Sequence, residues 1–363
     1  MVKSLKISVW LMVFVMIVSA CAPAGEATTI PTQGEPGETP TGARRLTVMT
    51  HDSFSVSEEV INAFQEQNNV EVSILQAGDA GTALIKAILA RGSPLADVFY
   101  GVDNTFLSRA LEENIFENYD SPLLDEIPDR FDLDPEHRAL PVDYGDVCLN
   151  YDKNYFAAQN LQPPQNLEDL LKPEYSDLLV VENPATSSPG LAFLLATIGH
   201  FGESGYLDYW RGLVENNVNV VNDWESAYYG EFTFSGGADP IVVSYGSSPP
   251  AEIIFAEEPV EEPSTAVITG DESCFRQIEF VGILNGTPNR ELAETWVDFM
   301  LSPTFQEDMP LQMFVFPVNE NAQLDETFRE FLVIPEETAE VSPEDIAANR
   351  DRWLQEWTEA VLR

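Results

Sequence analysis

The first third of the chain alternates short apolar runs with longer stretches that place apolar residues at helical spacing. Three runs have the length of buried strands: 45–50, 70–75 and 96–100. Between them, Ser55 and Glu58 have the spacing of a capping box, and residues 82–91 follow a glycine-rich turn as a second helix. This order predicts parallel strands with crossover helices, and therefore an α/β fold.

The pattern changes after residue 141, and strands become less regularly spaced. Further strands are predicted at 147–151, 178–181, 218–221, 241–245 and 276–283. Further helices are predicted at 191–198, 291–301 and 343–362. Ser188 suits the N-cap of the first of these helices, and Pro189 suits its first turn.

A chain of 363 residues exceeds the usual size of one hydrophobic core, so we expect two lobes. The formal net charge is −43. A surface this acidic repels phosphate backbones and anionic lipid headgroups, which excludes nucleic-acid binding and polybasic membrane binding. The acidity serves first as a solubilising surface, and second as a field that attracts a cationic ligand.

The start of the chain has the pattern of an export signal. Lys3 and Lys6 precede an apolar run, and Val18-Ser19-Ala20-Cys21 follows it. This order predicts a signal peptide over residues 1–20. The tetrapeptide resembles a bacterial lipobox, which implies acylation of Cys21 and a membrane anchor outside the cytoplasm. Residues 21–43 are rich in Pro, Gly, Thr and Glu and predict a disordered tether.

Two cysteines remain in the exported part, Cys148 and Cys274. An even pair of thiols in an exported chain favours a disulfide, with two buried free thiols as the alternative. Both cysteines lie at strands where we expect the chain to cross between lobes, so a disulfide would join the two crossings. Two distant cysteines without clustered histidines do not indicate a metal site.

Polar and aromatic residues follow several predicted strands, where ligands bind in α/β lobes. These strand ends are 50–53, 78–81, 101–104, 143–145 and 244–248, and the helix entry 186–188 joins them. Each segment alone is equally well explained as ordinary turn chemistry.

Taken in order, these segments resemble the thiamine-binding proteins of bacterial ABC importers, from about residue 45 to residue 363. The motifs are T-H-D-S-F, G-D-A-G, A-D-V-x-x-G-V-D-N, V-D-Y-G-D-V-C-L-N-Y-D-K, N-P-A-T-S-S-P-G, D-W-E-S-A-Y, S-Y-G-S-S-P and S-P-T-F-Q…F-P-V-N. The resemblance implies the type II periplasmic-binding-protein fold, with two α/β lobes, two crossing strands and a ligand cleft. We expect one lobe from 44–145 plus 274–363, including the C-terminal helices, and the other from 146–273.

The resemblance also implies a set of ligand-binding residues: Ala80, Gly81, Ser187, Ser188, Trp224, Tyr245, Gly246, Ser247 and Ser248. Asp79 lies one place before the acid of some relatives. Three positions depart from the family: Phe314 stands where relatives have a second Trp, Ala251 replaces a Tyr, and His51 replaces an early Tyr.

The chemistry of these residues suits a flat, positively charged ligand such as thiamine. Trp224, Tyr245 and Phe314 can stack on its rings, and a cation over an aromatic face gains about 0.5–2 kcal/mol. An acid, whether Asp79, Asp52 or Asp103, can face the positive ring. Backbone N–H groups at the helix start near Ser188 could receive the hydroxyethyl tail, with or without phosphate. Core packing is the alternative role of Trp224 and Phe314, and a structural role is the alternative for His51.

Other functions have weaker support. The chain has no nucleophile elbow, H-E-x-x-H or P-loop, so we expect no enzyme, no catalytic residue and no cofactor, with a hydrolase as the distant alternative. Ferric-ion binding would use clustered tyrosines, and Tyr228-Tyr229 is the candidate pair. A polyamine is a further alternative. We expect a monomer that binds thiamine or a thiamine phosphate and delivers it to ABC permease subunits.

Overall fold

The computed structural model describes residues 44–256, 260–270 and 272–363. The predicted signal peptide, the acylated Cys21 and the tether lie outside the described residues. Along the described chain, no helix is both long enough and apolar enough to cross a membrane.

A group of three parallel strands begins the described chain, as the sequence predicts. Strand β1 (Arg44–Thr50) pairs in parallel with β2 (Val70–Gln76) and β3 (Val98–Asp103). Helices α1 (Glu58–Asn68), α2 (Ala80–Leu89) and α3 (Leu107–Glu112) follow these strands in turn. Apolar strands that alternate with amphipathic helices form parallel pairs because each helix returns the chain to the same edge.

A second parallel group lies in the middle of the chain. Strand β6 (Leu179–Glu182) pairs in parallel with β7 (Asn219–Val221) and β8 (Ile241–Tyr245). Helices α5 (Ser188–Phe201) and α6 (Tyr206–Glu215) connect β6 to β7. Helix α5 is buried from Ser188 to Ile198, which explains why its sequence is apolar on all sides.

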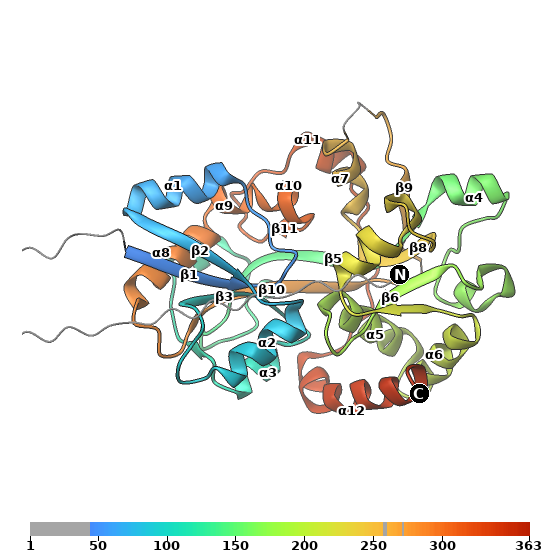
Figure 1. Cartoon of the computed structure of the whole chain (residues 1–363), viewed down its shortest axis with the longest axis horizontal. Coiled ribbons are helices and arrows are strands. Elements are labelled where there is room, and N and C mark those ends of the chain that lie inside the picture. Colours follow the sequence, from blue (N-terminus) through green and yellow to red (C-terminus); the bar gives the residue numbers. More distant parts are fainter. Residues whose placement is uncertain (1–43, 257–259, 271) are drawn as a thin grey trace, which may run out of the picture. The chain divides into compact units, whose positions relative to one another are not determined.

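Two long antiparallel strands join the groups, and Figure 1 shows them side by side through the middle of the molecule. Strand β5 (Leu140–Asp152) pairs with β10 (Phe275–Leu284), and the sheet order is β2-β1-β3-β10-β5-β8-β6-β7. Short strands β4 (Phe116–Glu117), β9 (Thr265–Ile268) and β11 (Phe316–Pro317) extend this centre. These are the crossing strands of the type II fold, although β5 is longer than the predicted 147–151.

A disulfide joins Cys148 of β5 to Cys274, which directly precedes β10, with a Cα–Cα distance of 4.3 Å. The neighbouring residues Val147 and Phe275 are paired across the two strands. The predicted pairing is therefore confirmed, and the cross-link holds the two crossing strands in register.

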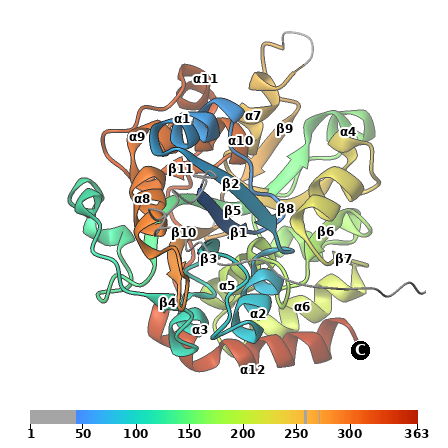
Figure 2. The same cartoon turned by 60° about the vertical axis from the view of Figure 1, so that its left-hand side comes forward.

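The C-terminal helices contact both halves of the sheet. Helix α8 (Arg290–Leu301) packs on β10, and α11 (Glu326–Phe331) packs on α7 (Ser248–Ile254). Helix α12 (Pro343–Val361) runs beneath α3 and α6 in Figure 2. Trp357 of α12 meets Trp210 of α6 edge-on at 5.4 Å between ring centroids. Helix α12 therefore contacts helices of both predicted lobes and α11 contacts a helix of the second, while the division into lobes stays a prediction.

The remaining helices are short. They are α4 (Lys153–Gln159), α9 (Pro303–Gln306), α10 (Met309–Met313), and the 3-10 turns η1 (Pro122–Glu126), η2 (Asp129–Phe131), η3 (Glu168–Leu171), η4 (Pro173–Tyr175) and η6 (Thr233–Ser235).

Two predicted helix caps are wrong because tertiary contacts use those side chains. Ser57, not Ser55, caps α1 by accepting a hydrogen bond from the Val60 amide, while the Ser55 hydroxyl donates to Gln312. Ser188 is the first residue of α5 and donates its hydroxyl to Asp103 instead of capping the helix. A local capping signal is a weak guide when a distant acceptor lies within reach.

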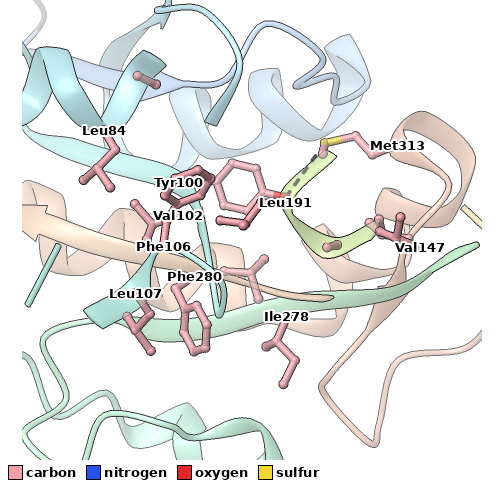
Figure 3. Close-up of a cluster of buried hydrophobic side chains, with 14 of the residues drawn as sticks. Leu84, Tyr100, Val102, Phe106, Leu107, Val147, Leu191, Ile278, Phe280 and Met313 are labelled. Atoms are coloured by element: carbon pink, nitrogen blue, oxygen red, sulfur yellow. Dashed lines mark hydrogen bonds between the residues drawn. The ribbon is translucent and has the colours of Figure 1, made fainter. Parts of the chain in front are cut away.

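The hydrophobic core is continuous beneath the crossing strands. Figure 3 shows Leu191 of α5 close to Tyr100 of β3, and Phe280 of β10 near Leu107 of α3. These side chains are almost completely buried. The core therefore fixes β3, β10 and α5 relative to one another, and the middle of β10 and the start of α5 contribute residues to the cavity described next.

Candidate ligand-binding site

A cavity of about 330 Å³ lies where the two parallel groups face each other. This volume is within the range of small-molecule sites. Of the predicted site residues, eight line it: His51, Asp52, Asp79, Ala80, Ser188, Trp224, Tyr245 and Phe314. Five others do not line it: Gly81, Ser187, Gly246, Ser247 and Ser248.

One side of the cavity is charged. We call His51, Asp52, Asp79 and Glu279 the charged wall; they come from the end of β1, the start of α2 and the middle of β10. Asp79 is the N-cap of α2, and its Oδ1 accepts a hydrogen bond from the Ala80 amide at 2.6 Å. Its Oδ2 accepts from the Trp224 amide at 3.2 Å. Burial raises the pKa of Asp79, although the Ser187 hydroxyl and the Ala80 amide oppose this rise.

His51 and Glu279 form an ion pair at the base of the charged wall. The distance from His51 Nε2 to Glu279 Oε1 is 3.4 Å, and the side chains are 9% and 4% exposed. Burial lowers the pKa of His51, but the negative charge of Glu279 and the nearby acids outweigh burial and raise it. A Cβ atom on Gly101 would lie 2.3 Å from the imidazole Cδ2, so only glycine at this position leaves room for the ring.

Behind Glu279 lies a buried acidic pair. Asp143 of β5 stands opposite Glu279 of β10, and the Tyr100 hydroxyl donates to Asp143 Oδ2 at 2.6 Å. The same hydroxyl lies 3.2 Å from Glu279 Oε2. Burial and the charge of Glu279 raise the pKa of Asp143 well above its usual range. Burial opposes ionisation of Glu279, but His51 and its other partners hold its pKa below the usual value. These opposite shifts favour one negative charge, rather than two, on the Asp143–Glu279 pair.

A second group of residues that line the cavity is aromatic. We call Trp224, Tyr229, Tyr245 and Phe314 the aromatic wall. Trp224 stacks on Tyr228 with centroids 5.1 Å apart and an interplanar angle of 19°. Tyr229 meets Trp224 edge-on at 5.4 Å. Both tyrosines belong to a single π-helical turn, η5 (Ser226–Glu231), a distortion that recurs at functional sites.

The predicted serines support this wall from behind. Trp224 Nε1 donates to Ser244 Oγ at 3.0 Å, and Ser244 Oγ lies 3.1 Å from Ser248 Oγ. The Ser247 hydroxyl donates to the backbone carbonyl of Phe314. Phe314 has a left-handed backbone with φ 62°, which is rare for a bulky side chain and is held here by that hydrogen bond.

Two contacts bring the halves of the site together outside the cavity. A Cβ atom on Gly81 would lie 3.0 Å from the Ala185 carbonyl oxygen and 3.1 Å from that of Thr186. Asp103 accepts hydrogen bonds from the hydroxyls of Thr105 and Ser188. Burial raises the pKa of Asp103 to about 6, against these donors. Gly81 and Asp103 therefore connect the two halves rather than contact a ligand in the cavity.

An acidic mouth adjoins the cavity. It is lined by Asp52 and Asp79 from one half and by Asp223 and Glu225 from the other. Burial, and after it repulsion from the neighbouring carboxylates, raises the pKa of Glu225. Among the described residues that line the main cavity, His51 alone can carry positive charge. The site therefore attracts cations and repels anions.

Glu279, Glu225 and Tyr229 line the cavity but were not predicted as site residues. A signal for Glu279 was present, because a single acid in the apolar run R-Q-I-E-F-V-G-I costs free energy unless it has a partner. Over the described part of the chain, no group of three or more His, Cys, Asp or Glu residues is placed to hold a metal ion. Tyr228 and Tyr229 are the pair considered above for ferric-ion binding. The planes of their rings are inclined at 86°, and both rings pack on Trp224.

Comparison with known proteins connects this geometry to a family. The pattern of the bacterial extracellular solute-binding protein family matches residues 93–334. The thiamine-binding periplasmic protein of Escherichia coli (strain K12) is 31% identical over 325 residues, which cover 88% of this chain and 94% of the relative.

Solved structures of periplasmic binding proteins also superpose on this chain. A periplasmic thiamin binding protein superposes with a TM-score of 0.79 at 29% identity, covering 90% of this chain and 100% of the other. A ferric binding protein from Campylobacter jejuni superposes with a TM-score of 0.69 at 20% identity, over 87% and 99% of the two chains. The second likeness concerns the fold alone.

Proposed function

Because this chain belongs to the bacterial extracellular solute-binding protein family, we propose that the solute it captures is thiamine. The chain is an extracytoplasmic solute-binding component of a transport system and not an enzyme. The chemistry of the cavity indicates which ligand the chain binds.

The observation that carries the proposal is the pairing of a charged wall with an aromatic wall in one cavity. Thiamine has a flat aminopyrimidine, a positively charged thiazolium ring and a short hydroxyl tail. Trp224 and Tyr245 provide aromatic faces for the rings, and Asp79 and Glu279 provide negative charge. The volume of about 330 Å³ admits a ligand of this size class.

The names of the relatives support the same ligand. The Escherichia coli relative and the superposed solved structure are both described as thiamine-binding, and each is covered almost entirely by this chain. We extend the proposal to delivery of thiamine to ABC permease subunits by a monomer that is anchored through a lipid on Cys21. Thiamine phosphates remain part of the proposal as secondary ligands.

Isothermal titration calorimetry of the purified protein with thiamine tests the proposal. Thiamine monophosphate, thiamine pyrophosphate, spermidine and ferric citrate form the comparison series. We expect tight one-to-one binding of thiamine. Absence of binding by thiamine and both phosphates would refute the proposed ligand and leave the solute-binding role intact. A stronger response to spermidine would assign the acidic mouth to a polyamine, and one to ferric citrate would assign the site to iron.

A further inference from the structure

Glu279 is the most deeply placed carboxylate of the charged wall, and no sequence motif marked it. Its side chain is 4% exposed, yet it lines the cavity from the centre of the crossing strand β10. The carboxylates of Asp52 and Glu225 are exposed, so water screens their charge. A buried anion that borders a ligand cavity acts on a bound cation with little screening.

The carboxylate of Glu279 faces the imidazole of His51, a side chain that can bind and release a proton. His51 Nε2 lies 3.4 Å from Glu279 Oε1, and among the described residues this nitrogen has no hydrogen bond of standard geometry. The imidazole is kept near Glu279 by Gly101 and by Tyr100, whose ring centroid is 5.6 Å away. His51 also lines the cavity, so its charge and the charge of a bound cation would share one anionic site.

Other titratable groups face this pair from every packed element. They are Asp52 after β1, Asp79 at α2, Tyr100 and Asp103 at β3, Asp143 on β5, Glu225 before η5 and Tyr245 on β8. Burial and the charge of Glu279 raise the pKa of Asp143 well above its usual range, which disfavours a second negative charge beside Glu279. An approaching cation would also favour loss of protons from Asp79, Asp103 and Glu225. Their contribution to proton release therefore has the same sign as that of His51.

We propose that Glu279 is a specificity-determining anion of the ligand site, and that protonated His51 occupies its field until a cationic ligand displaces the proton. This inference rests on the proposed function, because thiamine supplies the competing positive charge. Binding of thiamine places a second cation beside Glu279, and two positive charges in one buried site repel each other. The imidazolium therefore loses its proton to solvent while the ligand takes over the electrostatic role.

The expected pH dependence follows by linkage. Protonated His51 is favoured in the free protein and disfavoured in the complex, so binding releases a proton between the two corresponding pKa values. Affinity then rises with pH, by at most about tenfold per pH unit for each proton released. Below this window both states are protonated and the ligand binds against the imidazolium charge.

Calorimetry in two buffers of different ionisation enthalpy, PIPES and ACES, measures proton release directly. The titrant is thiamine, and the series covers about pH 5 to about pH 8, where histidine titrates. For the unsubstituted protein we expect release of a fraction of a proton that approaches about one in the middle of this window. This measurement requires no substitution, so it does not depend on the folding of any variant.

Two substitutions assign the proton. We expect His51→Gln to bind thiamine at least as tightly at low pH and to lose most of the proton release. We expect Glu279→Gln to bind about 10- to 100-fold more weakly, and also to lose the proton release, because its His51 is neutral. His200→Gln is the matched control, because His200 pairs with Glu168 at 2.9 Å outside the cavity. Glu182→Gln controls for removal of a buried carboxyl that does not line the cavity.

The outcomes are separable. Thiamine binding with no proton release at any pH, or unchanged release in His51→Gln, would overturn this inference and leave the proposed function intact. Normal affinity in a folded Glu279→Gln protein would do the same. No thiamine binding at any pH would overturn the proposed function, and this inference with it. Release confined to the unsubstituted protein and the two controls would support it.

Discussion

The two walls of the cavity are built by different physical means. On the charged wall, polar groups are held by specific partners: Asp79 caps α2, and Glu279 is paired with His51 and Tyr100. On the aromatic wall, rings are held by contacts with other rings: Trp224 is stacked on Tyr228 and meets Tyr229 edge-on. The charged wall selects the sign of the charge on the ligand, and the aromatic wall selects a ligand with a flat ring.

This difference explains why neither wall alone would identify the ligand. Four carboxylates around a cavity attract any small cation, including a polyamine. Aromatic faces accept any flat ring. Only a ligand that is both flat and positively charged satisfies the two walls together, and one hydrogen bond, from the Trp224 amide to Asp79, links them.

Loss of the largest ring should have the largest effect. Trp224→Ala removes both stacking and cation–π attraction, each worth roughly 0.5–2 kcal/mol; the middle of the combined range, about 2.5 kcal/mol, corresponds to a loss of thiamine affinity of about 70-fold. Calorimetry measures the loss. Trp224→Phe is the control, because it keeps a ring but not the Nε1 bond to Ser244, and should retain most of the affinity. Full affinity in Trp224→Ala would place the ligand away from the aromatic wall.

Removal of the charge of Asp79 should cost less than removal of the Trp224 ring. Asp79→Asn keeps a good N-cap for α2 but removes a negative charge, so we expect thiamine affinity about tenfold weaker. Asp325→Asn is the matched control, because Asp325 caps α11 and does not line the cavity. Equal losses in both variants, measured by calorimetry, would show that capping rather than charge explains the effect.

The sequence predicted the parallel groups from local patterns and favoured the disulfide from an even pair of cysteines, whereas the two crossing strands were implied by the family resemblance. The resemblance to thiamine-binding proteins selected Trp224, and the predicted strand ends contain Tyr245 and Asp79; the structure places all three around one cavity. Residues near strand ends gather in space, and this rule needs no tertiary information.

The remaining features depend on orientation and on distant partners. Ser247 and Ser248 lie at the predicted strand end but face away from the cavity, behind the rings that they support. Glu279 was missed because one acid within a strand has no characteristic spacing, and its partner His51 is distant in the sequence. The sequence identifies a neighbourhood, whereas packing decides which side chains face the ligand.

A third prediction concerns the approach of the two halves of the site rather than the chemistry of the cavity walls. Gly81→Ala adds a methyl group against the carbonyl oxygens of Ala185 and Thr186 and against the ring of Phe106. Overpacking of this kind costs about 1 kcal/mol or more, so thiamine affinity should fall about fivefold. The ligand-lining atoms are unchanged, and small-angle scattering should show a more open average structure with bound thiamine.

The matched control is Gly230→Ala, because a Cβ atom there meets no other atom within 4 Å. Unchanged affinity in Gly81→Ala would show that the two halves approach without this close contact. Equal losses in both variants would show that general helix effects, and not the contact with Ala185, are responsible.

The smallest expected effect separates exposed from buried charge within the charged wall. Asp52 is exposed and Glu279 is buried, so salt should screen the first and leave the second nearly unaffected. Raising NaCl from about 0.05 M to about 0.5 M should therefore weaken thiamine binding only about twofold. Asp52→Asn should remove part of this salt dependence, whereas Trp224→Phe should leave it unchanged. A much steeper dependence would mean that the exposed carboxylates supply most of the attraction, and that Glu279 is secondary.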